Sequence, residues 1–233
     1  MLLWIFLVFY CCTVVVHGMA GKLHYWSMKA RGYGIAVIAK AAGCELDWPR
    51  ESEDVCDARL VEHQAARILP FNQWPMVELE GGKRIVQSGA IMRFYARRGK
   101  IDGGDSEDAY ILNEQLMCEA EDIMMALGKA MYDTSDGGNN KAAFDKLFTD
   151  LGWFPRHAGY LEQMLTGPGP YFQPGPKRLA GAYYLACVLD IARDVQPTCL
   201  DATPKLKTFL EAMLSLPEFV GYSDRDIYFR RAD

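Results

Sequence analysis

Two neighbouring features between Trp74 and Ser88 have the chemistry to hold a short acidic peptide. Proline has no backbone N–H, so Pro75 belongs at the entry of the strand that follows it. A cis bond before Pro75 would turn the chain and leave the backbone N–H and C=O of Trp74 free to pair with an extended ligand. Ser88 fits the N-cap of the next helix, whose free N–H groups attract a carboxylate. The alternative is a hairpin and a capped helix that bind no ligand.

The same stretch follows a known pattern. The run Phe71-x-Gln73-x-Pro75-Met76-Val77-Glu78, followed by Gln87-Ser88-x-Ala90-Ile91, resembles the glutathione-binding core of the cytosolic glutathione transferases. Upstream, Leu23-His24-Tyr25-Trp26 followed by Ala30-Arg31-Gly32 resembles the first strand and helix of the tyrosine-type classes (alpha, mu, pi and sigma). The resemblance covers about residues 22–222, nearly everything after the apolar start of the chain.

The resemblance implies that Tyr25 and Arg31 activate a thiol. A thiol must become a thiolate to attack an electrophile, and the thiol of glutathione is mostly protonated near neutral pH. A phenol at the end of the first strand can donate a hydrogen bond to the sulfur, and the family's arginine stabilises the negative charge. Ser27 is the rival, because serine-type classes place a hydroxyl near the following turn. The turn Ser27-Met28-Lys29 is longer than in the tyrosine-type classes. Without a ligand, Tyr25 would be a core tyrosine and Arg31 a solvated residue.

The resemblance also implies how glutathione, the expected co-substrate, is held. Gln73 and the backbone of Trp74, which precedes Pro75, would hold the cysteinyl–glycine part. Gln87 and Ser88 would hold the γ-glutamyl end.

Four further residues have implied roles. Arg67 is a candidate for the glycine carboxylate, although it falls beside the family's basic position. Glu121 or Asp122 would reach across a dimer axis to the γ-glutamyl amine, or else both are solvated surface residues. Phe71 matches the aromatic "key" that alpha-, mu- and pi-like transferases insert into the partner subunit, so the resemblance implies a homodimer. The alternative is a loop phenylalanine folded onto its own core.

The implied activity is conjugation of the glutathione thiolate to small hydrophobic electrophiles, in a pocket between two domains. Six side chains are candidates for shaping that pocket: Tyr25, Met124, Met125, Tyr132, Tyr228 and Phe229. A sigma-like isomerase that uses glutathione is a variant of this prediction. The alternative is a catalytically silent binding or structural protein. It is favoured by the uncommon Trp74 before Pro75, by the long turn after Tyr25 and by Arg178-Leu179-Ala180-Gly181, which replaces the family's Ser/Thr-x-x-Asp capping box.

The elements that must position these residues form an α/β half. Short β runs and helical periodicities alternate in the order βαβαββα, the thioredoxin-like layout. The predicted strands are Leu23–Trp26, Leu46–Trp48, Met76–Leu79 and Arg84–Val86, and the predicted helices are 30–43, 55–67 and one from Ser88. This domain is expected over residues 22–98.

The second half has almost no strand signal. Residues 99–106 form a linker by composition, and an all-helical domain is expected over residues 107–233. Its predicted helical segments are 107–127, 141–165 with an interruption at Pro155, 179–193, 204–214 and 217–222.

Composition excludes several other classes of protein. A net charge of −5 makes nucleic acid an unfavourable partner. The seven cysteines are scattered, which is typical of reduced cytosolic thiols, and neither they nor the four histidines have the spacing of a metal site, so no metal is expected.

Residues 1–18 are treated separately because they are almost entirely apolar. They are short for a membrane span and fit the apolar region of a signal peptide, but lack its basic start and a clear cleavage site. A signal or short anchor would lead to the secretory pathway or a membrane. An upstream extension that Met19 replaces as the start would leave the protein cytoplasmic, which is the main expectation.

Overall fold

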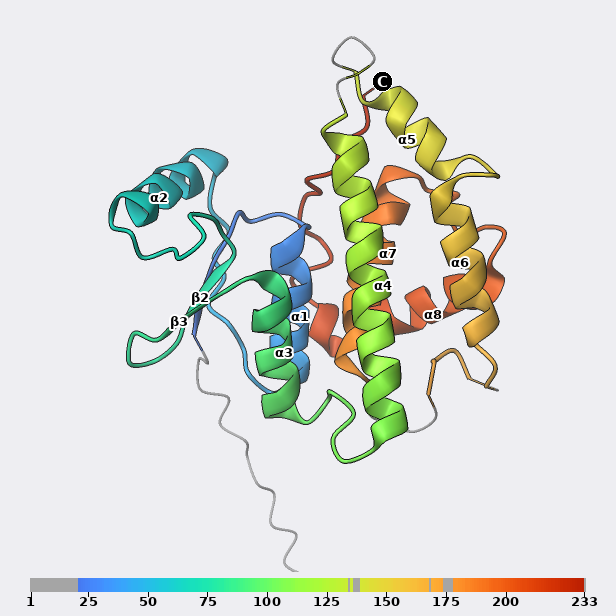
Figure 1. The fold of residues 1–233 in the computed structure, drawn as a ribbon, viewed down its shortest axis with the longest axis horizontal. Helices are drawn as coiled ribbons and strands as arrows, with labels where there is room; N and C mark the ends of the chain where they lie inside the picture. The colour runs from blue at the N-terminus through green and yellow to red at the C-terminus, as the bar shows by residue number, and fades with distance from the viewer. Residues whose placement is uncertain (1–20, 134, 136–138, 168, 174–177, 233) are drawn as a thin grey trace, which may run out of the picture.

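The computed structural model describes residues 21–133, 135, 139–167, 169–173 and 178–232, so the predicted segment 1–18 lies outside the described residues. The first half contains β1 (Lys22–His24), α1 (Arg31–Ala41), α2 (Glu53–Ala65), β2 (Met76–Glu78), β3 (Arg84–Val86) and α3 (Ser88–Gly99). The second half contains α4 (Glu107–Met131), α5 (Lys141–Phe148), α6 (Trp153–Met164), α7 (Ala180–Val195), α8 (Pro204–Leu214) and the short 3₁₀ helix η1 (Pro217–Phe219). A thioredoxin-like half followed by a helical half confirms the predicted fold class (Figure 1).

The sheet has three strands in the order β1-β2-β3, and both neighbouring pairs are antiparallel. The predicted strand at Leu46–Trp48 is reduced to one parallel bridge between Lys22 and Asp47. Its two backbone bonds, Leu23 N to Asp47 O and Asp47 N to Gly21 O, are both 2.9 Å long. Pairing ends there because Pro49 has no N–H to continue the ladder.

The helices pack on the sheet from both sides. In Figure 1, α2 lies on one side of the sheet, and α1 and α3 lie between the sheet and α4. Helix α1 is buried along nearly its whole length because it packs against α3 and also against α7. One hydrophobic core therefore runs through both halves, and the proposed boundary between residues 22–98 and 107–233 stays a prediction.

The second half is organised around α7, which is buried at almost every position and packs along α4. The predicted helix 141–165 is two helices, and the break lies at residues 149–152, before Pro155 rather than at it. Pro155 falls in the first turn of α6, where backbone N–H groups have no partner within the helix, so proline is tolerated there. None of the described helices is both long and apolar enough to cross a lipid bilayer.

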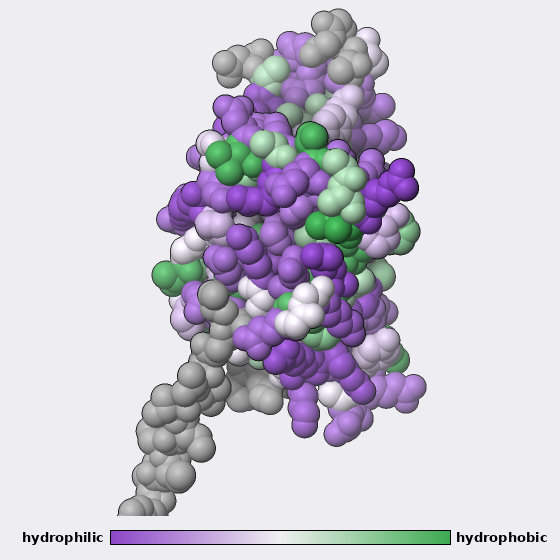
Figure 2. Space-filling view, turned by 90° about the vertical axis from the view of Figure 1, so that its left-hand side faces the viewer, coloured by the Kyte–Doolittle hydropathy of each residue, from purple (hydrophilic) through white to green (hydrophobic). Residues whose placement is uncertain are grey.

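The outer side of the first half is mostly hydrophilic, with small, separate apolar patches (Figure 2). Three large hydrophobic residues of α2 and the loop after it are exposed: Val55, Val61 and Phe71. Phe71 is 61% exposed, so it does not fold onto the core of its own chain.

Candidate active site

Tyr25 directly follows β1, and its ring packs on the first turn of α1. A Cβ on Gly32 would lie 2.6 Å from Cδ1 of that ring, so only glycine allows this approach. The Tyr25 carbonyl accepts a hydrogen bond of 3.3 Å from Trp48 Nε1. These two contacts hold Tyr25 between the end of the strand and the start of the helix.

The environment of the Tyr25 hydroxyl keeps it protonated. Burial raises the pKa of Tyr25 to about 12, while the charge and the backbone N–H of Arg31 lower it by a smaller amount. At neutral pH the hydroxyl is therefore a hydrogen-bond donor and not a base. Because Arg31 acts on the pKa of this hydroxyl, the long turn after Tyr25 does not separate the two residues.

Arg31 links Tyr25 to the rest of the site. Its guanidinium donates to Ser88 Oγ at 3.1 Å and to Met125 Sδ at 3.2 Å, and forms an ion pair with Glu121 at 2.8 Å. Burial disfavours its charge, but Glu121 more than offsets this, so the pKa of Arg31 is raised. Glu121 also accepts a hydrogen bond of 2.6 Å from Tyr184 Oη. Its carboxylate is thus engaged within its own chain, and the expected reach across a dimer axis stays a prediction.

A cavity of about 490 Å³ adjoins this network. Seven of the nine predicted site residues line it: Arg31, Gln73, Trp74, Pro75, Gln87, Ser88 and Glu121. Arg67 and Tyr25 are not among its lining residues. Arg67 is exposed, as is Asp122, the alternative to Glu121. Arg31 is the residue through which Tyr25 and the cavity are connected.

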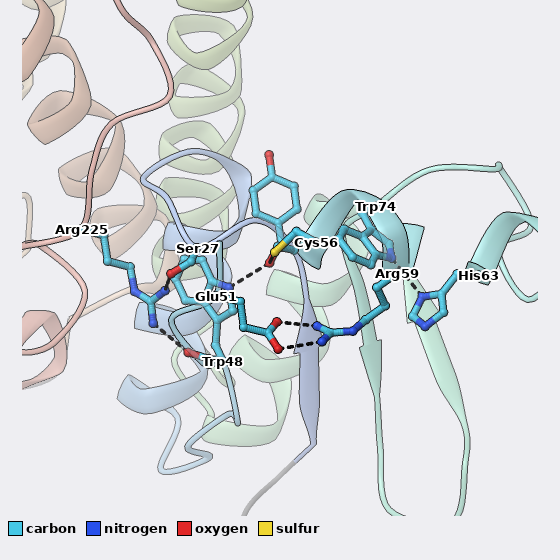
Figure 3. A network of polar contacts seen from close by, with 9 residues as sticks. Ser27, Trp48, Glu51, Cys56, Arg59, His63, Trp74 and Arg225 are labelled. Atoms are coloured by element: carbon cyan, nitrogen blue, oxygen red, sulfur yellow. Dashed lines mark hydrogen bonds and ion pairs between the residues drawn. The ribbon is translucent and has the colours of Figure 1, made fainter. Parts of the chain in front are cut away.

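The Trp74-Pro75 bond is cis, and Trp74 is buried. Its indole Nε1 donates to His63 Nδ1 at 3.2 Å, a contact drawn in Figure 3. Within the described part of the chain, the backbone N–H and C=O of Trp74 make no hydrogen bond. This is the free pair of groups that the sequence predicts for an extended ligand.

The start of α3 differs from the prediction in one detail. The N-cap is Gln87, with a φ of 71°, and Ser88 is the first residue of the helix. Ser88 does not cap the helix because its hydroxyl instead accepts the hydrogen bond from Arg31. Ser88 and Gln87 still line the cavity together, beside the first N–H groups of α3.

Comparison with known proteins shows what this chain is similar to. No family model matches the chain. It is 25% identical over 209 residues to the glutathione S-transferase Mu 1 of Macaca fascicularis, an alignment covering 88% of this chain and 90% of the relative. The pi-class glutathione S-transferase of Onchocerca volvulus superposes with a TM-score of 0.72 at 23% identity, over 88% of this chain and 92% of that one. The prostaglandin synthase D of Nilaparvata lugens superposes with a TM-score of 0.70 at 18% identity, over 85% and 94%. The chain is thus similar in sequence and in fold to glutathione transferases.

Several cavity residues carry no signal in the transferase motifs. Arg93 lies in α3 and donates to Glu114 of α4 at 2.8 Å. Cys118 is an exposed thiol on α4, and Tyr184 comes from α7. The spacing of Glu114 and Cys118, four residues apart on α4, could have indicated that they share one helix face. The sequence around Tyr184 has no motif that predicts its position in the cavity wall, because α7 reaches the cavity only through tertiary packing.

Apart from Tyr25, the residues predicted to shape a second-substrate pocket separate into two groups. Met124 and Phe229 lie in the core, at 2% and 5% exposure, and neither lines the 490 Å³ cavity, so their assignment to a pocket has no support here. Met124 points inward because it shares the face of α4 that packs on α7. Met125 on α4 and Tyr132 directly after it are exposed, and the Tyr132 hydroxyl hydrogen-bonds that of Tyr228. These three side chains remain candidates for the pocket.

Ser27 is engaged elsewhere. Its hydroxyl accepts a hydrogen bond of 2.5 Å from Arg225 (Figure 3). A hydroxyl held by a guanidinium is poorly placed to meet a ligand thiol, which favours Tyr25 over Ser27.

Proposed function

We propose that the protein is a glutathione transferase that conjugates the glutathione thiolate to small hydrophobic electrophiles. The observation that carries this proposal is the protonated Tyr25 hydroxyl at the start of α1, connected through Arg31 to a cavity lined by the glutathione-type residues. The cavity volume falls in the usual range for small-ligand pockets, about 300–1,000 Å³.

The proposed chemistry requires a hydrogen-bond donor and a positive charge near the sulfur atom of glutathione. The glutathione thiol releases its proton to solvent, and the thiolate accepts a hydrogen bond from Tyr25 Oη, which lowers the pKa of the thiol. Arg31 adds a partly compensated positive charge. The sulfur then forms a bond to the electrophilic carbon, and the leaving group departs with the bonding electrons, or a proton adds where the electrophile is an activated alkene.

Glutathione is proposed to lie along the cavity as an extended peptide. The free N–H and C=O of Trp74 would pair with its cysteinyl backbone, and Gln73 would contact the adjoining part. The γ-glutamyl carboxylate would meet Ser88, Gln87 and the first N–H groups of α3. Glu121, on the same wall, would attract the γ-glutamyl amine from within the same chain. Arg67 has no support as a ligand contact, because it is exposed and lies outside the cavity lining.

We further propose a homodimer with a detoxifying role in the cytoplasm, and no nucleic-acid partner. The 61% exposure of Phe71 supports its role as the interface key, because a large apolar side chain on a loop gains free energy when a partner covers it. The described cysteines are free thiols, which suits a reducing compartment.

The test is the replacement of Tyr25 by Phe, which removes only the hydroxyl. Turnover of a generic aryl halide should fall about 10- to 100-fold, since one positioned donor is lost, while retention on immobilised glutathione stays intact. Tyr160→Phe is the matched control, because Tyr160 is an exposed tyrosine on α6. If Ser27→Ala depresses turnover instead, the assignment of Tyr25 is wrong.

A catalytically silent glutathione-binding protein is the second candidate. One observation favours it: Tyr25 is not among the residues that line the cavity. Retention of the wild-type protein on immobilised glutathione without turnover of any electrophile in a broad panel would support this candidate and exclude the enzyme.

A further inference from the structure

The C-terminal segment of the chain lies against the turn that follows Tyr25. The Lys29 N–H donates to Asp226 O at 2.6 Å, and the Tyr228 N–H donates to Lys29 O at 3.3 Å. Lys29 and Ile227 form a parallel bridge. The turn that is longer than in the tyrosine-type pattern is therefore held on its outer side by a segment almost 200 residues away in the sequence.

Arg225 is the side chain through which this segment reaches the core. It is 6% exposed, and its guanidinium donates to Ser27 Oγ at 2.5 Å and to Trp48 O at 2.7 Å. Its carbon Cζ also lies 3.8 Å from the centre of the Trp48 ring, which is a cation–π contact. Figure 3 shows Arg225 hydrogen-bonded to Ser27 and to Trp48 at once.

This guanidinium is buried without a carboxylate. Within the described residues Arg225 has no ion-pair partner, because the neighbouring Asp224 carboxylate binds Arg50 at 2.5 Å instead. Burial, and then the charge of Arg50, lower the pKa of Arg225. Placing an unpaired cation in the interior is costly. The contacts with Ser27 and Trp48 offset part of that cost and restrict the guanidinium to one geometry.

The contacts continue from Trp48 to the reacting end of the site. Trp48 Nε1 donates to the Tyr25 carbonyl at 3.3 Å. Both rings press on the same point of α1, since a Cβ on Gly32 would lie 2.6 Å from the Tyr25 ring and 2.9 Å from that of Trp48. A shift of Trp48 would therefore move the backbone and the ring of Tyr25 together.

We propose that Arg225 is a positioning residue for Tyr25: it fixes Trp48 and the Ser27 turn, and the C-terminal segment thereby sets the geometry in which the Tyr25 hydroxyl meets the thiol. This inference rests on the proposed transferase function. Arg225 itself touches neither glutathione nor the electrophile; it acts through Trp48.

Arg225→Met tests the proposal, because Met keeps the length and apolar stem of the side chain and removes the donors and the charge. The readout is the pH dependence of kcat/KM for the electrophile at saturating glutathione, whose acidic midpoint reports the pKa of the thiol in the enzyme–glutathione complex. The midpoint should rise by about one unit, with a roughly tenfold loss of kcat/KM at neutral pH, as expected when one hydrogen bond to the thiolate is weakened. Retention on immobilised glutathione should not change. Arg225→Lys should recover part of the shift, because lysine keeps a charge and a donor.

Two more variants keep the test decisive. Arg230→Met is the matched control: Arg230 is exposed in the same segment, and its replacement should leave the midpoint where it is. Trp48→Phe removes the hydrogen bond to Tyr25 but keeps a ring under Arg225, and should shift the midpoint in the same direction even if Arg225→Met does not fold. If the wild type is active and the midpoint is unshifted in Trp48→Phe and in folded Arg225 variants, this proposal alone is overturned. A wild type without turnover overturns the proposed function instead.

Discussion

Replacement of Asn113 by Ala should destabilise the protein, because Asn113 caps a helix to which it does not belong. The first residues of α7 have no capping side chain of their own, and the N-cap is Leu179. Asn113, on α4 and only 1% exposed, supplies the missing acceptor: the Gly181 N–H donates to its Oδ1 at 2.8 Å. The Ala180 N–H donates to Ile101 O at 2.8 Å, so the helix start is satisfied by tertiary contacts.

The magnitude follows from the loss of this one acceptor. Alanine at 113 leaves the buried N–H of Gly181 without a partner, which costs about 1–3 kcal/mol of unfolding free energy. Gly181 packs closely on α4, since a Cβ there would lie 2.4 Å from Asn113 O. In a chain of this length such a loss lowers Tm by about 2–4 °C for each kcal/mol.

The assay is urea denaturation at one fixed protein concentration, because dimerisation would make stability depend on concentration. Gln115→Ala is the matched control, as Gln115 is exposed two residues further along α4. It should change the unfolding free energy by less than about 0.5 kcal/mol. An Asn113→Ala protein as stable as this control would refute the cap. Asn113→Asp, which keeps an acceptor at the positive end of α7, should lose less than Asn113→Ala.

Two further predictions concern the surroundings of β1 and α1. His24 is buried, and this burial, with a smaller contribution from His63, lowers its pKa from 6.5 to about 4. Between pH 6.5 and 4 the unfolded chain therefore carries a proton on His24 that the folded chain does not bind. The free energy of unfolding should fall by about 1.4 kcal/mol per pH unit across this range. His24→Phe should largely remove this slope in unfolding measurements. The second prediction concerns Gly32→Ala, which would place a Cβ 2.6 Å from the Tyr25 ring. It should lower the free energy of unfolding by about 1–3 kcal/mol and depress turnover. Gly128→Ala, in α4 with open space around its Cβ, should be neutral or stabilising by up to about 1 kcal/mol; a similar loss of turnover in both variants would contradict the steric argument.

The parts of the site that could be predicted are those encoded by short local patterns. Gln73, Trp74 and Pro75 fall on one turn, and Gln87 and Ser88 on one helix start, so their spacing alone brings them to a common wall. Helix periodicity likewise predicted α4, α7 and α8 to within a few residues. The strand at Leu46–Trp48 and the helix break near Pro155 were placed less well, because in both cases the backbone hydrogen bonds of neighbours decide where an element ends.

The contacts that could not be predicted join residues far apart in the chain. The missing cap at Arg178–Gly181 was read correctly from the sequence, but its replacement, Asn113, is 68 residues away and has no signature as a cap. The burial of Met124 could not be predicted from the sequence for a related reason. Adjacent residues on a helix point in directions about 100° apart, so Met124 and Met125 differ in burial, and only the docking of α7 decides which of them faces solvent.

The same distant contacts determine how the charge of Arg31 acts. From the sequence, Arg31 is a free cation available to a thiolate. In the fold its guanidinium already has an anionic partner 2.8 Å away in Glu121, and a further hydrogen bond to Ser88. A cation that is largely neutralised by a carboxylate stabilises a second anion only weakly, so most of the stabilisation of a thiolate has to come from the Tyr25 hydroxyl, whose raised pKa keeps it a donor. The position of that hydroxyl then matters more than the charge beside it, which is why the residues that hold Tyr25 in place, Gly32, Trp48 and Arg225, have as much bearing on the chemistry as Arg31.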